Sequence, residues 1–232
     1  MSEKMKSEFL ERDVIKLFGL MAVLIEKNVP EFAGHSFRVA VFAHALGKKL
    51  NLSNFDLKVL KLSCLLHDIG KGVVDKKLFE KSRRLTPEDF KILKKHVSDL
   101  FGPFKRIRGI EPVVDAILQH HERYDGLGYP NKVKGEQISM MSRIISIVDA
   151  FDSICNINIL DRETENIVDL AVGELLKGKE IQFDPFIVDV FVDLIKTGQI
   201  TRLNENLNRR LNSKSRLDAY LEVDDKYCRI RS

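Results

Sequence analysis

The sequence predicts an all-α protein, and three observations support this prediction. Apolar residues recur with helical spacing along most of the chain, no segment shows the sustained alternation of a β-strand, and prolines and glycines fall between the periodic segments. The chain has 232 residues, of which 44% are hydrophobic and 31% are charged, so it can bury a substantial core. A disordered, fibrous or repeat protein is therefore not expected.

The expected helices follow one another along the chain. The first spans residues 7–27, where Leu17, Leu20 and Leu24 belong to an apolar stripe and Pro30 marks the break. Another begins at Thr86, because Thr-Pro-Glu-Asp supplies an N-cap hydroxyl, a proline in the first turn and two carboxylates at the positive end of the helix. The remaining periodicity places helices at 35–50, 54–67, 111–121, 138–155, 163–176 and 185–196.

Two glycine-rich segments are expected to be loops. The stretch Ile-Gly-Lys-Gly follows Asp68 at a predicted helix end, and residues 125–135 contain three glycines and Pro130. Beyond Thr197 the chain becomes polar and basic. We therefore divide the chain into an N-terminal helix that packs on the bundle, a main domain and a basic C-terminal extension, at residues 1–30, 31–197 and 198–232.

Composition limits the compartment and the partners. The longest apolar run, residues 17–25, is too short to span a bilayer, and no secretion signal is recognisable. Three cysteines stand far apart without the spacing of a zinc or redox motif, so we expect reduced thiols. A net charge of +4 is spread along the chain and does not argue for a nucleic acid polymer. We expect a cytoplasmic protein that binds no membrane.

Histidines and carboxylates are the main functional signal. His67 and Asp68 stand side by side at a helix end, where both side chains can reach one cation. Asp149 lies on the apolar face of its predicted helix, and a buried carboxylate needs a cation or hydrogen-bond donors. Of six histidines, five stand beside a carboxylate, another histidine or a glycine-rich turn: His35, His67, His96, His120 and His121.

The spacing of residues along the predicted helices adds to this set of candidate ligands. Glu31 stands four residues before His35, one helical turn away, so both could bind one ion. His120 and His121 would diverge by about 100° on a helix, yet both could reach into a wide site. His44 has no acidic or glycine partner nearby in the sequence, and we interpret it as a packing or surface residue.

The candidate ligands are imidazole nitrogens and carboxylate oxygens without a thiolate, a set that suits iron, manganese or zinc. Eight candidates are too many for one ion and fit two or three metals that share bridging carboxylates and hydroxide. Two such metals make a bridging water acidic and hold a phosphodiester for in-line attack. The alternative is a group of core histidines with satisfied hydrogen bonds, which would require five independent coincidences.

The motifs match a known family. They read His35-Ser-Phe-Arg38-Val, Leu66-His67-Asp68-Ile-Gly70-Lys71, His96, His120-His121-Glu122-Arg-Tyr-Asp125-Gly126-Leu-Gly128-Tyr129-Pro130 and Val148-Asp149-Ala-Phe151-Asp152. The pattern resembles the HD-GYP domain, a branch of the HD metal-dependent phosphohydrolases whose members hydrolyse cyclic di-GMP. The resemblance covers about residues 31–196, and the long His-His-Glu string is its most specific part. It implies an HD-type helical bundle with a di- or trinuclear metal site between the helices.

The resemblance also implies roles for individual residues. Lys71 and Asp152 would join Asp68 as catalytic residues by helping to position the nucleophilic hydroxide or the leaving oxygen, although Lys71 could instead be a solvated loop cation. Glu31 matches the third-metal glutamate of some members. The cofactors would be two or three divalent transition metals, iron or manganese, bound by His35, His67, Asp68, His96, His120, His121 and Asp149.

The loop that contains Asp125, Gly126, Gly128, Tyr129 and Pro130 matches the segment that the family uses near the site and with diguanylate cyclase partners. A purely structural turn is an equally good interpretation of its glycines and proline. Both interpretations are compatible with one another.

One part of the family pattern is missing. Members that act on cyclic di-GMP follow the Asp-x-x-Asp segment with Arg-Pro-Tyr-Arg/Lys, whose two cations bind the substrate. In this chain the corresponding positions are Asn158-Ile-Leu-Asp161. Arg162 could replace one of the two missing cations only if the loop shifts by one residue. Arg38 and Arg123 remain as other candidate phosphate partners.

We therefore expect a phosphodiesterase that hydrolyses a cyclic dinucleotide, cyclic di-GMP first, by attack of a metal-bridging hydroxide. One alternative is a catalytically weak signalling or binding module that lacks the substrate clamp. Another is a phosphohydrolase for a different nucleotide.

Overall fold

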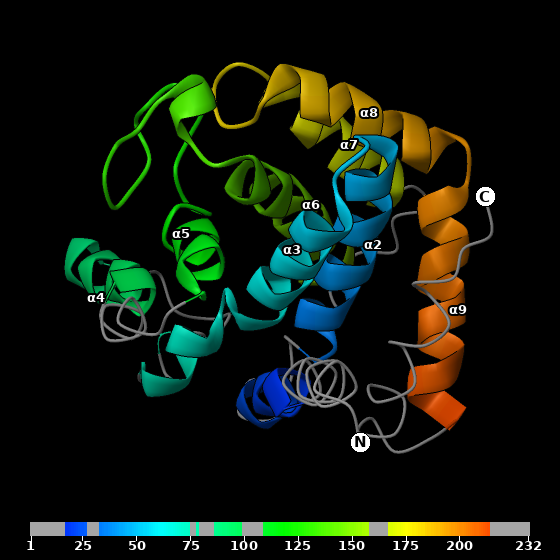
Figure 1. The fold of residues 1–232 in the computed structure, drawn as a ribbon, viewed down its shortest axis with the longest axis horizontal. Helices are drawn as coiled ribbons and strands as arrows, with labels where there is room; N and C mark the ends of the chain where they lie inside the picture. Colours follow the sequence, from blue (N-terminus) through cyan, green and yellow to red (C-terminus); the bar gives the residue numbers. More distant parts are fainter. Residues whose placement is uncertain are drawn as a thin grey trace.

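The computed structural model describes residues 17–26, 33–74, 78, 86–98, 109–157 and 167–213. Within these ranges the protein is helical and forms no β-strand, only an isolated bridge between Lys179 and Phe183. The all-α prediction is confirmed. Residues 17–26 are helical, and the other helices in Figure 1 are α2 (His35–Lys49), α3 (Asn54–Leu66), α4 (Pro87–Ser98), α5 (Glu111–Leu118), α6 (Met140–Ile157), α7 (Ile167–Lys177), α8 (Pro185–Lys196) and α9 (Gln199–Ser213).

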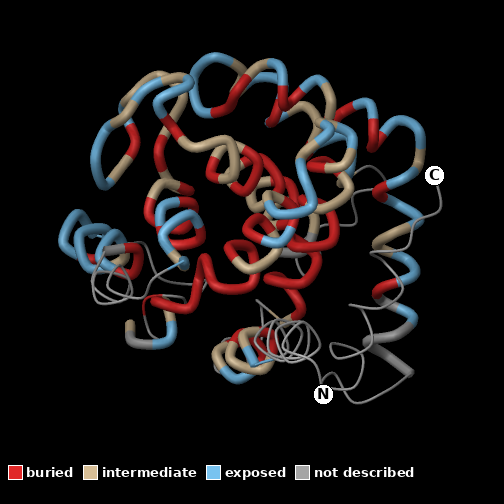
Figure 2. The backbone as a smooth tube through the Cα atoms, viewed as in Figure 1, coloured by how far each residue is buried: buried red, intermediate tan, exposed pale blue. Residues whose placement is uncertain are grey.

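Helices α2, α3 and α6 form the centre of the bundle, where Figure 2 shows most of the buried backbone. Three phenylalanines connect α2, α6 and α8 in the larger of two apolar clusters. The ring centroids of Phe42 and Phe151 lie 6.2 Å apart, and those of Phe151 and Phe191 lie 5.3 Å apart in an edge-to-face arrangement. A second cluster packs α3 against α5 and the end of α4, with Val97 and Ile117 fully buried.

Side-chain caps fix several helix starts. Thr86 Oγ1 accepts the backbone N–H of Asp89, and Asp89 Oδ2 accepts the N–H of Thr86, which confirms the start predicted for α4. Ser53 caps α3, and Asp184 caps α8 ahead of Pro185. The described residues also include the short 3-10 helices η2 (Ile69–Val73), in a segment expected to be a loop, and η5 (Gly135–Gln137), which begins at the last residue of the other expected loop.

The largest differences from the predicted helices lie at the end of α5 and in the C-terminal segment. Helix α5 ends at Leu118, three residues before the predicted end. Residues 199–213 form α9, which was not expected in a polar, basic tail. Ile200 and Leu207 are buried, and α9 packs against α2 and α8, so these two apolar residues explain why the segment is helical here. In the part of the chain that the structure describes, no helix is long and apolar enough to cross a membrane.

Candidate metal centre

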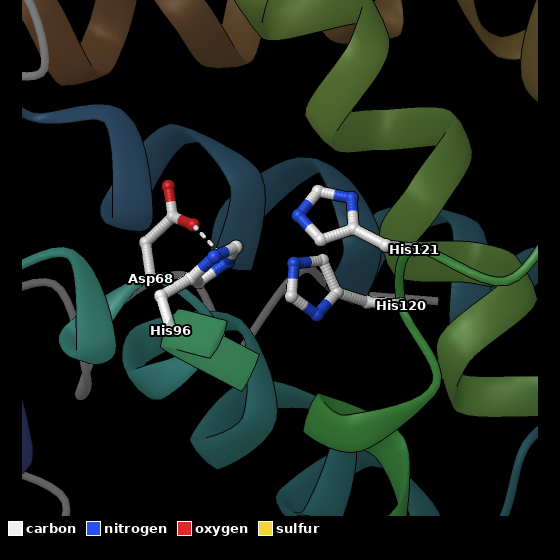
Figure 3. A group of neighbouring side chains, drawn as sticks. All are labelled: Asp68, His96, His120 and His121. Atoms are coloured by element: carbon white, nitrogen blue, oxygen red, sulfur yellow. Dashed lines mark ion pairs between the residues drawn. The ribbon is translucent and has the colours of Figure 1, made fainter. Parts of the chain in front are cut away.

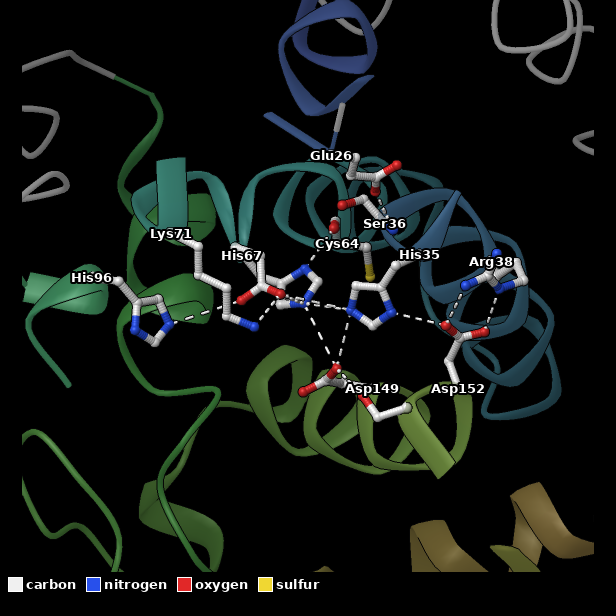
Figure 4. Close-up of polar contacts among 12 residues, drawn as sticks. Glu26, His35, Ser36, Arg38, Cys64, His67, Lys71, His96, Asp149 and Asp152 are labelled. Atoms are coloured by element: carbon white, nitrogen blue, oxygen red, sulfur yellow. Dashed lines mark hydrogen bonds and ion pairs between the residues drawn. The ribbon is translucent and has the colours of Figure 1, made fainter. Parts of the chain in front are cut away.

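The structure brings seven of the eight predicted ligands together at the centre of the bundle (Figures 3 and 4). These residues lie on, or directly after, five different helices. Most stand at or beside a helix end, and Asp149 lies within a helix. Glu31 lies outside the described residues. His35 begins α2, His67 and Asp68 follow α3, His96 lies near the end of α4, His120 and His121 follow α5, and Asp149 lies on α6.

These side chains form two groups that share Asp68. In one group, which Figure 3 shows, Asp68, His96, His120 and His121 each offer a ligand atom, and all four atoms lie within 4.8 Å of one another. Asp68 also belongs to a second group of the same dimensions with the two remaining histidines, His35 and His67.

Asp149 lies beside the second group and contacts two of its histidines. Its Oδ1 lies 3.1 Å from Nε2 of His35 and 3.9 Å from Nε2 of His67 (Figure 4). One carboxylate, Asp68, therefore lies between two sets of ligands.

Three histidines are oriented by their own helices. Nδ1 of His67 lies 2.8 Å from the carbonyl oxygen of Cys64, and Nδ1 of His120 lies 2.6 Å from that of Ile117. His96 makes the same contact with Leu93. Because a carbonyl only accepts, Nδ1 carries the hydrogen in each ring, and the lone pair of Nε2 faces the centre. This is the tautomer that metal-binding histidines adopt.

The chemistry of the donor atoms fits metal ions. Nε2 of His96, Nε2 of His120 and Oδ1 of Asp68 are buried and have no hydrogen-bond partner among the described residues. Buried polar atoms are nearly always satisfied, and two imidazole lone pairs and a carboxylate oxygen can be satisfied together by a divalent cation. The nearby Cys64 thiol does not compete, because burial raises its pKa.

The protonation states of Asp68, Asp149 and His121 agree with this interpretation. Burial raises the pKa of the Asp68 carboxyl, but the opposing effect of His67 and Lys71 is larger and holds it below its usual range. The pKa of Asp149 is also lowered, by His35 and His67. Burial lowers the pKa of His121 to about 3. At neutral pH these groups are ionised carboxylates and a neutral imidazole, the states that bind metals.

Arg38 and Asp152 form a layer behind His35. Nδ1 of His35 lies 2.8 Å from Oδ2 of Asp152, and Nε of Arg38 donates to Oδ1 of Asp152 at 2.7 Å. Arg38 also donates to Oδ2 of Asp152 and to the carbonyl oxygen of Ala33, and it is only 6% exposed.

The geometry bears on two expectations. Arg38 holds Asp152 instead of lying open to a phosphate, because its guanidinium is buried against that carboxylate. Asp152 lies on the Nδ1 side of His35, away from Asp149, where it contacts His35 and Arg38. Its expected role in positioning a nucleophile or a leaving oxygen stays a prediction.

The two other predicted cations, Lys71 and Arg123, each contact an aspartate. Nζ of Lys71 is 2.5 Å from Oδ2 of Asp68, and its side chain is 20% exposed, which places it at the edge of the site instead of in open solvent. Arg123 makes two hydrogen bonds to Asp125, of 3.1 and 2.7 Å, and thereby tethers the glycine-rich loop. A phosphate contact for Arg123 stays a prediction. Asn158, Asp161 and Arg162 lie outside the described residues.

His120 and His121 lie side by side. Their ring centroids are 3.9 Å apart with an interplanar angle of 40°. The divergence of about 100° expected from helical spacing does not occur, because α5 ends at Leu118 and both histidines follow in a turn. The turn is what lets two adjacent residues contribute to one ligand group.

The glycine-rich loop folds back onto this turn. The Tyr129 ring stacks on His121 with centroids 4.9 Å apart, and the backbone N–H of Tyr129 donates to the His121 carbonyl oxygen. A Cβ atom on Gly128 would lie 2.3 Å from the backbone nitrogen of Arg123, so only glycine allows this approach. The turn role expected for Gly128 is present, and the loop contacts a predicted ligand.

No role was predicted from the sequence for two buried glutamates, Glu122 and Glu26. Glu122 accepts the backbone N–H groups of Asn131 and Lys132 at 2.6 and 3.0 Å and ties down the end of the loop. Its place beside His121 in the motif was an available signal. Glu26, at the end of the helix over residues 17–26, bonds to the start of α2, and no motif indicated it.

The fold and the shared Asp68 define a helical protein with a two-centre ligand cluster. The model of the HD domain family matches residues 19–187, and the chain belongs to this family. The resemblance to HD-GYP proteins is confirmed.

The chain is similar to proteins with named activities. It is 33% identical over 141 residues to 3'3'-cGAMP-specific phosphodiesterase 3 of Vibrio cholerae, an alignment that covers 61% of this chain and 30% of that protein. It is 28% identical over 203 residues to the cyclic di-GMP phosphodiesterase of Thermotoga maritima, covering 84% of this chain and 54% of the relative. The chain thus matches 30% of the length of one relative and 54% of the other.

A solved structure shows the same fold. The cyclic GMP-AMP specific phosphodiesterase V-cGAP3 of V. cholerae matches 90% of this chain and 53% of its own with a TM-score of 0.65 and 18% identity. At this identity the likeness concerns the helical architecture alone.

Proposed function

We propose that this chain is a metal-dependent phosphodiesterase that hydrolyses a cyclic dinucleotide, with cyclic di-GMP as the first candidate. The observation that carries the proposal is Asp68, which belongs to both ligand groups. The named activities of the two relatives, one on 3'3'-cGAMP and one on cyclic di-GMP, support the class of substrate.

The ligand groups indicate which residues would hold the cofactor. His35, His67 and Asp149 would bind one ion, the three histidines of the other group a second, and Asp68 both. Two such ions, when bound, lower the pKa of coordinated water and neutralise phosphate charge. Imidazole and carboxylate ligands without thiolate favour iron or manganese. Glu31 remains the proposed ligand of a third ion.

The remaining residues of the site act by charge and by orientation. Lys71 holds a positive charge beside Asp68 at the exposed edge, where an anionic phosphodiester would be attracted. Asp152, itself held by Arg38, fixes the His35 ring so that Nε2 faces Asp149. Tyr129 restricts the His121 ring by stacking on it.

A second candidate function is a catalytically weak module that binds a nucleotide or a partner. The observation that favours it is in the sequence, where Asn158 and Asp161 stand in place of the two substrate-binding cations of the family pattern. The loop could then serve as a contact for a diguanylate cyclase domain, because Leu127 at its tip is 76% exposed.

One experiment separates these proposals. The protein, loaded with iron or manganese, is incubated with cyclic di-GMP, 3'3'-cGAMP, cyclic di-AMP and linear nucleotides, and products are separated by chromatography. We expect hydrolysis of a cyclic dinucleotide and none by a matched Asp68→Asn variant. Binding of a cyclic dinucleotide without turnover would favour the binding module. Turnover of linear nucleotides alone would indicate another phosphohydrolase.

A further inference from the structure

Glu26 is a buried carboxylate outside the ligand groups. It is the last described residue of the helix over residues 17–26 and is 7% exposed. Its Oε2 accepts the backbone N–H of Gly34 at 2.7 Å, and its Oε1 accepts that of Ser36 at 2.8 Å (Figure 4). The two N–H groups that Glu26 accepts belong to the residues directly before and after His35.

Glu26 provides the N-terminal cap that the sequence of α2 itself lacks. The first N–H groups of a helix have no acceptor within the helix, and a side chain at the N-cap usually accepts one. The N-cap of α2 is Gly34, which has no side chain, and the first turn contains no acidic residue. Glu26 supplies two acceptors and a negative charge that the helix dipole stabilises.

The helix that carries Glu26 packs against both apolar clusters of the bundle. Val23 belongs to the larger apolar cluster, and Ile25 packs against the second. Ile25 also approaches Gly72, four residues after Asp68, closely enough that a Cβ there would lie 3.2 Å away. The position of Glu26 is thus set by contacts with both apolar clusters and with the segment that follows Asp68.

Glu26 also borders the site itself. A small pocket is lined by Glu26, His35, Asp68 and Lys71, and Ala22 and Ile25 contribute apolar side chains to its wall. In the view of Figure 4, Glu26 and Asp149 lie on opposite sides of His35. Both carboxylate oxygens of Glu26 bond to backbone N–H groups, which argues against its being a further metal ligand.

We propose that Glu26 is a positioning residue for the metal ligand His35, acting as a remote cap that connects the helix over residues 17–26 to the start of α2. The inference rests on the metal centre of the proposed function but not on any substrate. Outer residues that orient a ligand change metal affinity by about 10- to 100-fold when they are replaced. Loss of the cap should therefore weaken the ion at His35 and spare the other.

Metal titration of chelator-treated protein tests this proposal. Manganese binding is followed by the paramagnetic resonance signal of the free ion in the wild type, in Glu26→Gln and in His35→Ala. The glutamine has the same shape as glutamate but lacks the charge and one acceptor. We expect Glu26→Gln to weaken one binding step about tenfold. That step should be the one that His35→Ala removes.

The control is Glu205→Gln on α9, an exposed residue far from the site in sequence, which should bind manganese as the wild type does. Unchanged binding by Glu26→Gln, or an equal loss at both steps, would overturn the proposal. Circular dichroism checks the folding of each variant. If Glu26→Gln does not fold, Glu26→Asp carries the same test, with a smaller loss at the same step. The titration uses no nucleotide, so failure of hydrolysis leaves its result intact.

Discussion

Oδ2 of Asp152 lies 2.8 Å from Nδ1 of His35, on the side of the imidazole ring opposite to Asp149. The ring is therefore held between two carboxylates, of which only Asp149 belongs to the ligand cluster. Burial alone would lower the pKa of His35, but the hydrogen bonds that its ring donates to Asp149 and Asp152 outweigh this effect and raise the pKa to about 10. The same negative charges would stabilise a cation bound to Nε2.

The first prediction concerns the partner of Asp152. Arg38→Met should lower the free energy of unfolding by about 3–5 kcal/mol, because it leaves Asp152 buried without its cation. The double variant Arg38→Met with Asp152→Asn should recover much of this loss. Urea unfolding in the presence of chelator measures both. Losses that simply add in the double variant would contradict the pairing.

The second prediction concerns the close approach of the loop to the turn that carries His121. Gly128→Ala should destabilise the protein by about 1–3 kcal/mol, because the new methyl group would overlap the backbone of Glu122 and Arg123. It should also reduce metal binding, since Tyr129 must move away from His121. Gly173→Ala is the control. No atom lies within 4 Å of its Cβ position on α7, so alanine there should stabilise the helix by about 0.5–1 kcal/mol.

Thermal unfolding and metal analysis of the two glycine variants measure this difference. Equal stability of Gly128→Ala and the wild type would show that the loop can shift without cost, and would remove the argument that it holds His121.

Local patterns in the sequence predicted much of the helical framework. The start of α4 followed from a capping pattern at Thr86 that is confined to four residues. The candidate metal ligands followed from residue types that stand next to one another in the sequence. The end of α5 was not predictable from the sequence pattern, because no glycine or proline follows Leu118 closely enough to mark the end of the helix.

The residues that orient the ligands were harder to recognise, because their partners are distant in the sequence. Arg38 and Asp152 are 114 residues apart, and neither has a local signal for the other. Arg38 was therefore interpreted as a phosphate partner. Glu26 caps α2, which begins after Gly34, eight residues further along the chain. Only the packing of the bundle creates this contact. Helix α9 depends in the same way on burying Ile200 and Leu207.

The third prediction is a pH dependence that does not involve a metal ligand. His44 on α2 is half-buried, and its two ring nitrogens have no partner among the described residues. Burial, and then the charges of Lys48 and Lys61, lower its pKa to about 4. As the pH falls from about 6.5 toward 4, the unfolded chain binds this proton before the folded protein does, so stability is lost in that window.

Replacing His44 by leucine removes this contribution. The free energy of unfolding of His44→Leu should fall less steeply between pH 6.5 and 4 than that of the wild type, with both proteins measured in chelator. The two slopes should agree above pH 7.5, where His44 is neutral in both states. Identical slopes below pH 6.5 would show that the imidazole is solvated in the folded protein.

The fourth prediction concerns the two replaced cations of the family pattern. If Asp161 lies about 4 Å from a substrate phosphate, the repulsion is about 1 kcal/mol in water-like surroundings and about 4 kcal/mol at an effective dielectric constant of 20. Asn158→Arg with Asp161→Lys should therefore lower KM for cyclic di-GMP and change kcat little. Steady-state kinetics at matched metal content measure this. An unchanged KM would mean that the segment does not face the substrate.

The central claim is that two ligand groups sharing Asp68 hold at least two metal ions in each chain. Elemental analysis of protein purified without chelator and supplemented with iron or manganese tests it directly, with Asp68→Ala as the comparison. We expect two or more transition-metal ions per wild-type chain, and fewer in the variant because a shared ligand is lost. One ion or fewer per wild-type chain, or full metal content in Asp68→Ala, would contradict the account.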